Sequence, residues 1–208
     1  MEIKQRVTRL TGLGFRKVGL RRARGDDGSA LTAALATMRR KRYCLLVTES
    51  EVGPSARVVQ PHRPDEQMAV HLGTSAGSRK ADEIARQATA LLVYQDDSRA
   101  ACVVARCTAQ LLDDEASRRR WFMPGWSAFW PDGPGPDFIV IRCEPQELEV
   151  WDAWRGITPP PFGLASHHLH RTDAGWTGRS TKPVTTESAS RQPAQIRPHP
   201  RRSHFGHI

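Results

Sequence analysis

Five short apolar segments follow one another closely in the first half of the chain, and they constrain the fold more than any other feature. Each is rich in Val, Leu, Ala or Cys, and several are bounded by Gly, Pro or Asp, as β-strands are. Strands spaced this closely predict a barrel or a sandwich. The five segments are Tyr43–Thr48, Ala56–Gln60, Met68–Leu72, Ala90–Gln95 and Ala101–Leu111.

Helical patterns precede, interrupt and follow these segments. Ser29 is the predicted N-cap of a first helix that ends near Met38. A second helix is predicted over Ser78–Arg86, with Ser78 as its cap. The acidic run at 113–115 favours the start of a third helix.

A last long strand is predicted to begin at Phe138–Ile141. We expect it to be broken by Pro145 and to resume at Glu147–Trp151. Together with the earlier segments, this pattern predicts an α+β fold that is mostly antiparallel.

The net charge of +9 is located at the two ends of the 208-residue chain. Residues 1–28 carry eight Lys/Arg against three acids, and residues 179–208 carry six against one. The stretch between them holds 17 basic and 18 acidic residues. A nearly neutral middle is unlike a domain with a basic groove, so nucleic acid or another polyanion is expected to bind only through the ends, if at all.

Composition divides the chain into three parts. After Gly178 there are almost no aliphatic residues, so we expect 179–208 to be a disordered basic tail. Residues 1–28 form a basic extension that is either partly ordered or disordered. Residues 29–178 are then one domain, the only part long enough to bury a substantial core.

We expect the protein to be cytoplasmic, without a membrane partner. Its apolar runs are far shorter than the roughly 20 residues of a membrane-spanning helix, and the Arg-rich N-terminus lacks the apolar stretch of a secretion signal. The cysteines occur singly, without a Cys-x-x-Cys pair, which favours small buried hydrophobes over zinc ligands or disulfides. They are Cys44, Cys102, Cys107 and Cys143.

Three histidines, His167, His168 and His170, invite a metal or haem interpretation. His168 and His170 would share one face of a strand. Because no carboxylate lies nearby at a recognisable ligand spacing, solvated or core-bonded histidines are favoured, and no metal site is predicted.

The segment Thr74–Lys80 is the most informative for function. It follows a predicted strand, opens a helix, and places hydroxyls, a glycine and the cations Arg79 and Lys80 at the helix start. Backbone N–H groups, the helix dipole and charged side chains all favour an anion there, as in a phosphate site. From the spacing alone, an ordinary solvated helix start explains the pattern slightly better.

Arg57 lies in an apolar strand, where an unpaired cation is costly. It therefore requires an anion if its side chain is buried. The alternative, an outward-facing strand residue, explains this stretch equally well.

The order of these pieces resembles the flavin-binding core of the pyridoxamine 5'-phosphate oxidase-like family. Arg57-Val58-Val59 is followed by a strand, by Thr74, by Ser78-Arg79-Lys80 opening a helix, and by another strand. The general-stress-protein branch is most similar. The resemblance covers residues 29–178 and implies a mostly antiparallel split β-barrel with a few flanking helices, which binds FMN at a homodimer interface.

The resemblance also implies roles for individual residues. In the family, the strand arginine and the Arg-Lys pair hold the FMN phosphate, while the Thr and Ser positions contact the phosphate or the ring. The two residues after the arginine present main chain beside the ring. Two tryptophans of a Gly/Pro-rich loop are expected to reach the neighbouring subunit's flavin. The predicted cofactor-binding residues are Arg57, Val58, Val59, Thr74, Ser75, Ser78, Arg79, Lys80, Trp126 and Trp130.

Two departures from the family narrow the expected activity. Cys107 stands where this branch often has glycine, and the C-terminal Arg and His pattern that holds the substrate phosphate in authentic pyridoxamine 5'-phosphate oxidases is missing. Vitamin B6 oxidation is therefore not expected.

The implied function is that of an FMN-dependent oxidoreductase of general stress type, with an unidentified small-molecule substrate and electron donor. No catalytic residue is assigned, because a flavin carries the redox chemistry itself. The alternatives are an F420-dependent enzyme of the same fold, a haem-binding split barrel, and a non-catalytic flavin-binding module.

Overall fold

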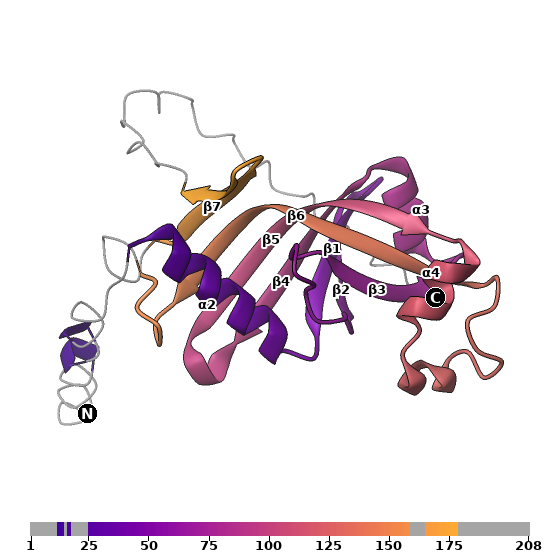
Figure 1. The fold of residues 1–208 in the computed structure, drawn as a ribbon, viewed down its shortest axis with the longest axis horizontal. Coiled ribbons are helices and arrows are strands. Elements are labelled where there is room, and N and C mark those ends of the chain that lie inside the picture. The colour runs from indigo at the N-terminus through magenta and orange to yellow at the C-terminus, as the bar shows by residue number, and fades with distance from the viewer. Residues whose placement is uncertain (1–11, 15, 18–24, 159–164, 179–208) are drawn as a thin grey trace, which may run out of the picture.

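A computed structural model describes residues 12–14, 16–17, 25–158 and 165–178. The predicted tail at 179–208, most of the extension at 1–28 and the 159–164 segment lie outside the described residues. Helices cover the ends of a single sheet (Figure 1). Between residues 25 and 158 the helices are α2 (Asp27–Arg40), α3 (Arg79–Arg86) and α4 (Glu115–Trp121), with short 3-10 turns η1 (Asp97–Arg99) and η2 (Pro124–Ala128).

In the described part of the chain, eight antiparallel strands form the sheet, and the five predicted ones are among them. Their order is β2-β1-β4-β5-β6-β7-β8, and β3 pairs with the first part of β6. The strands are β1 (Cys44–Ser50), β2 (Gly53–Val59), β3 (Val70–Ser75), β4 (Thr89–Asp96), β5 (Ala101–Leu112), β6 (Phe138–Asp152), β7 (His167–Thr172) and β8 (Gly175–Gly178).

The sheet curls into a barrel because β6 is long enough to serve two neighbours along one edge. Its first half pairs with β3 up to Cys143, and its second half pairs with β7 from Glu147 onward. An isolated bridge between Pro61 and Leu72 then links the segment after β2 to β3. Among the described residues, backbone pairing between the segment after β2 and β3 consists of this bridge and the hydrogen bond from His62 N to His71 O. We call this part of the barrel the seam.

The predicted break at Pro145 is wrong. Strand β6 runs through it, and the pairing register with β5 shifts between Arg106 and Cys107, where Cys107 faces Pro145 and Arg106 faces Glu147. Gln146 is the extra residue of a β-bulge. Pro145 also lies where neither β3 nor β7 pairs with β6, so a strand can tolerate proline there.

Helix α2 closes one end of the barrel with small residues. Ala30, Ala33 and Ala34 are fully buried against the sheet. The helix begins three residues earlier than predicted, because the carboxylate of Asp26 accepts a hydrogen bond from the Ser29 amide at 2.8 Å. Asp26, not Ser29, is therefore the N-cap.

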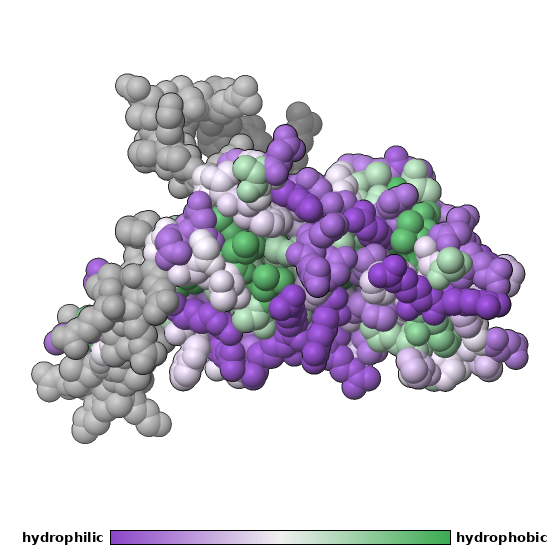
Figure 2. Space-filling model, viewed as in Figure 1, coloured by the Kyte–Doolittle hydropathy of each residue, from purple (hydrophilic) through white to green (hydrophobic). Residues whose placement is uncertain are grey.

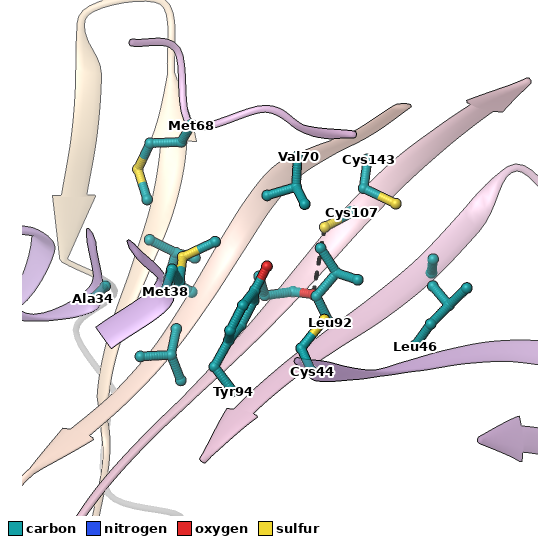
Figure 3. Close-up of a cluster of buried hydrophobic side chains, with 14 of the residues drawn as sticks. Ala34, Met38, Cys44, Leu46, Met68, Val70, Leu92, Tyr94, Cys107 and Cys143 are labelled. Carbon is teal, nitrogen blue, oxygen red and sulfur yellow. Dashed lines mark hydrogen bonds between the residues drawn. The ribbon is translucent and has the colours of Figure 1, made fainter. Parts of the chain in front are cut away.

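Tyr94 and three thiols occupy the middle of the core (Figure 3). Burial raises the pKa of Cys44 to about 12, and it also raises the pKa of Tyr94. Cys107 and Cys143 lie beside them and are likewise buried. The prediction that the cysteines are small buried hydrophobes is confirmed for Cys44, Cys107 and Cys143. No helix within the described residues is both long enough and apolar enough to cross a membrane.

Candidate functional site

A groove of about 930 Å³ lies over the seam, at the end of the barrel where α3 and α4 meet the sheet. The end of β2 forms one wall, and the end of β3 with the start of α3 forms the opposite one. The turn η2 and the loop after it cover the groove with aromatic residues. Figure 2 shows apolar side chains at this end of the molecule and also in the other half, near α2, within a surface that is otherwise largely hydrophilic.

Hydroxyl groups line the groove at the start of α3. Thr74 and Ser75 are the last residues of β3, so the strand continues three residues beyond the predicted one. Ser78 caps α3 as predicted, and its Oγ lies 3.0 Å from Thr74 Oγ1. Ser75 Oγ donates to Asp137 Oδ1 at 2.8 Å, which fixes the end of β3 against the loop before β6. These contacts hold the hydroxyls in place beside the helix N-terminus.

Arg57 obtains its anion from within the protein. Its Nη2 lies 2.6 Å from Glu83 Oε2 and 3.0 Å from Ser55 Oγ, and its Nη1 donates to Thr48. Glu83 is fully buried on α3. Burial alone would raise the pKa of Glu83, but hydrogen bonds from Thr48 and Arg57 and the charge of Arg57 outweigh it and lower the pKa. Glu83 therefore remains a carboxylate.

Arg79 and Lys80 point to different surroundings. Arg79 is mostly exposed, lies 3.4 Å from the second oxygen of Glu83 and donates to Ser55. Lys80 lines the groove and makes no ion pair with any residue that the structure describes. Burial and the nearby charge of Arg57 lower the pKa of Lys80. A half-buried cation without a partner favours an anion in the groove beside it.

The aromatic wall is built on a glycine. A Cβ placed on Gly73 would lie 2.4 Å from Trp126 and 2.6 Å from Phe138, so only glycine fits beneath these rings. Trp126 is buried in a cluster with Phe138 and Val140. Trp130 packs edge-on against Phe138, and its Nε1 donates to Asp137 at 3.3 Å.

The structure brings eight of the ten predicted residues together on this groove. Arg57 and Arg79 are the two that do not line it, although both contact Glu83, beneath the helix start. The eight are Val58, Val59, Thr74, Ser75, Ser78, Lys80, Trp126 and Trp130.

Sequence reasoning missed several other residues at this end of the molecule. Nothing in the sequence around Glu83 indicates that it pairs with Arg57, which lies 26 residues earlier. Gly73 directly precedes the predicted phosphate site. Its importance is visible only from the packing of Trp126, in a distant loop, against it. Trp121 is stacked on His71, with ring centroids 3.6 Å apart and planes 9° apart. Arg42, Tyr43, Gln60 and Met123 also line the groove.

No metal centre is apparent at His167, His168 and His170, the histidines considered as possible ligands. Among the described residues, no group of three His, Cys, Asp or Glu side chains could hold a metal ion. His167 instead lies 2.9 Å from Asp27 at the start of α2.

The fold is an α+β split barrel, and hydroxyl side chains and Lys80 at the start of α3 line the groove over its seam. The family model described as pyridoxamine 5'-phosphate oxidase like matches residues 32–168, and the chain belongs to that family. A search of curated proteins found no match.

Solved structures share this fold. A protein related to general stress protein 26 from Clostridium acetobutylicum is 18% identical, with a TM-score of 0.56, 62% of this chain and 92% of that chain being covered. An FMN-binding, pyridoxamine 5'-phosphate oxidase-related protein from Nostoc punctiforme is 19% identical, with a TM-score of 0.52 and coverage of 72% and 94%. PhzG from Burkholderia lata, in complex with tetrahydrophenazine-1-carboxylic acid, is 18% identical, with a TM-score of 0.53 and coverage of 72% and 86%. At these identities the likeness is one of fold.

Proposed function

We propose that the protein is a cytoplasmic FMN-binding oxidoreductase of general stress type that holds the cofactor in the groove over the seam. The observation that carries this proposal is the position of Lys80, a half-buried cation without a partner among the described residues, beside the hydroxyls at the start of α3. The relative from Nostoc punctiforme is named as FMN-binding, which supports the choice of cofactor.

The groove residues at the start of α3, which we call the cradle, fit a phosphate group. Lys80 supplies charge, Thr74, Ser75 and Ser78 supply hydroxyls, and the N-terminus of α3 adds its dipole. Arg79 adds a second, exposed cation. Arg57 contributes its charge from below while Glu83 holds it in position. Arg57 has five N–H groups. Within the described part of the chain, three of them donate hydrogen bonds, one from Nη1 and two from Nη2, which leaves the others for a ligand.

The remainder of the groove fits a flat aromatic ring. Val58 and Val59 provide strand backbone on one side, and Trp126 and Trp130 provide aromatic surface on the other. A volume of about 930 Å³ lies within the range of sites for cofactors of this size. The flavin supplies the redox chemistry, and the residues of the chain bind and orient it.

A second copy of the chain completes the site in this proposal. Tyr43, Leu45 and Val58 are all exposed, and Leu45 pairs directly with Val58 across β1 and β2. An apolar strand face of this kind favours burial against a partner. Since Val58 also lines the groove, a homodimer formed here would close the groove. Sedimentation is expected to show a dimer; a monomer with full cofactor occupancy would contradict it.

The experiment that tests the function is identification of the cofactor released from natively purified protein. Mass spectrometry and visible absorbance are expected to show FMN. Release of a deazaflavin or a haem would replace the proposed cofactor, and absence of any cofactor from protein that cannot be loaded with FMN would overturn the proposal. Bound FMN that no electron donor reduces would indicate a flavin-binding module without catalysis.

A further inference from the structure

A second hollow of about 420 Å³ adjoins the groove. The two share Arg42, Gln60 and Met123 as lining residues. Gln60 Nε2 lies 3.7 Å from Met123 Sδ, so these two side chains mark the boundary between the two spaces. The groove and this second hollow, which we call the basic hollow, are therefore neighbours that meet at these two side chains.

The basic hollow is strongly cationic. Five of its nine lining residues are Lys or Arg, and none is Asp or Glu. Asp96 is the carboxylate that pairs with two of them, at 2.9 Å from Arg40 and 3.8 Å from Lys41. The other cations make no ion pair with any side chain in the described part of the chain. They are Arg39, Arg42 and Arg63.

The helix dipole does not account for this charge. Basic residues are favoured in the last turn of a helix, and Arg39 and Arg40 occupy the last turn of α2. Arg42, however, lies beyond the helix end, with its guanidinium 5.4 Å from the centre of the Tyr43 ring, and Tyr43 lines the groove. Arg63 comes from the separate segment between β2 and β3. Two segments thus bring like charges to one place, which is unfavourable without an anion.

We infer that the basic hollow binds the anionic end of the small molecule that reacts in the groove. This inference rests on the proposed function. The molecule carries at least two negative charges, as phosphate or carboxylate groups, because arginine forks bind both kinds of oxyanion. Its reactive part lies past Gln60 and Met123, in the groove. The substrate class is therefore a small polyanion.

The test uses the full-length protein loaded with FMN, whose content is measured first by visible absorbance. Pyrophosphate and citrate are then titrated at constant ionic strength, and binding is followed by calorimetry and by the flavin absorbance. Loading with FMN keeps the phosphate cradle occupied, so the probes report on other sites. The tighter of the two probes identifies phosphate or carboxylate as the preferred group.

The variant Arg39→Gln with Arg63→Gln removes one cation from each converging segment. Since each charged hydrogen bond contributes at least about tenfold in affinity, binding of the tighter probe is expected to weaken roughly 100-fold or more. The matched control, Arg106→Gln with Arg119→Gln, removes two surface cations elsewhere and is expected to change affinity by less than about threefold.

Several outcomes overturn the inference while leaving the proposed function intact. One is that FMN-loaded protein binds neither pyrophosphate nor citrate. Another is that both double variants bind the probe equally weakly. A third is that the probe binds but leaves the flavin absorbance unchanged. Failure of the wild-type protein to take up FMN would overturn the proposed function, and with it the assignment of the basic hollow to that function's substrate.

Discussion

The guanidinium of Arg57 lies 2.6 Å from a carboxylate oxygen of Glu83, which joins strand β2 to helix α3 directly below the cradle. Glu83 is fully buried, and its other oxygen lies 3.4 Å from Arg79. One buried carboxylate therefore positions two of the cations predicted to act on a phosphate. Lys80, on the same helix turn, is left without a partner among the described residues and faces the groove.

Glu83→Gln is expected to destabilise the fold by about 3 kcal/mol at pH 7, because it leaves the partly buried charge of Arg57 without its counter-ion. Urea unfolding measures the loss. Glu51→Gln is the matched control, since it removes an exposed carboxylate that pairs with Arg86 on the surface, and it is expected to cost less than about 1 kcal/mol.

Acid unfolding of the same variant gives a second readout. The pKa of Glu83 is lower in the folded than in the unfolded chain, so its contribution to stability is present above the unfolded value, about pH 4.3, and is lost as the pH falls through the folded value. The wild-type protein is expected to lose this contribution in acid, whereas Glu83→Gln has none to lose. Identical acid dependence of the two proteins would contradict the buried ion pair.

Gly73→Ala is expected to destabilise the fold by roughly 1–3 kcal/mol, because its Cβ would lie 2.4 Å from Trp126 and force the ring to move. Since Trp126 lines the groove, FMN affinity is expected to fall as well. Thermal unfolding and flavin titration measure the two effects. Gly135→Ala places a Cβ where no atom lies within 4 Å and is expected to change neither; equal effects of both variants would remove the packing argument.

His71→Phe is expected to flatten the pH dependence of stability in weak acid. Burial lowers the pKa of His71 from its usual 6.5 to about 4. Between these values the unfolded chain binds more protons, so stability falls as the pH is lowered through this range, by at most about 3 kcal/mol. Phenylalanine keeps the stacking on Trp121 and removes the proton site.

Urea unfolding at pH 4.5 and 6.5 measures the change in slope for His71→Phe. The control is the wild-type protein, measured side by side at the same two pH values. An unchanged slope in His71→Phe would show that the imidazole of His71 does not control this range.

Local signals in the sequence predicted most of the barrel. The cap at Ser78, the start of α3 and the five early strands depend on neighbouring residues, so the sequence pattern was sufficient for them. The start of α2 was a local error, because Asp26 and not Ser29 is its N-cap. The other errors lie where distant residues determine the structure. The bulge at Gln146 depends on how β5 pairs with β6, and the last residues of β3 are strand only because β6 pairs with them.

The candidate site, too, was predicted only in part. The residue types at the start of α3 are those of an anion site, although from the spacing alone an ordinary solvated helix start explained them slightly better. The partner of Arg57 could not be predicted, because Glu83 resembles any acid in a helix until α3 is packed against β1 and β5 and the ion pair with Arg57 forms. The basic hollow combines Arg39 and Arg63, which only the closing of the barrel brings to one place.

The central claim is that Lys80 and Arg79 bind the phosphate of FMN, and comparison of two ligands tests it most directly. Apoprotein of the wild type and of the Arg79→Ala, Lys80→Ala double variant is titrated with FMN and with riboflavin by flavin fluorescence, with circular dichroism as the control for folding. Each charged hydrogen bond contributes about 1.5–3 kcal/mol, so the variant is expected to bind FMN roughly two to four powers of ten more weakly. Riboflavin lacks the phosphate, and its affinity is expected to change little. Equal FMN affinity in the two folded proteins, or equal losses for both ligands, would contradict the phosphate assignment.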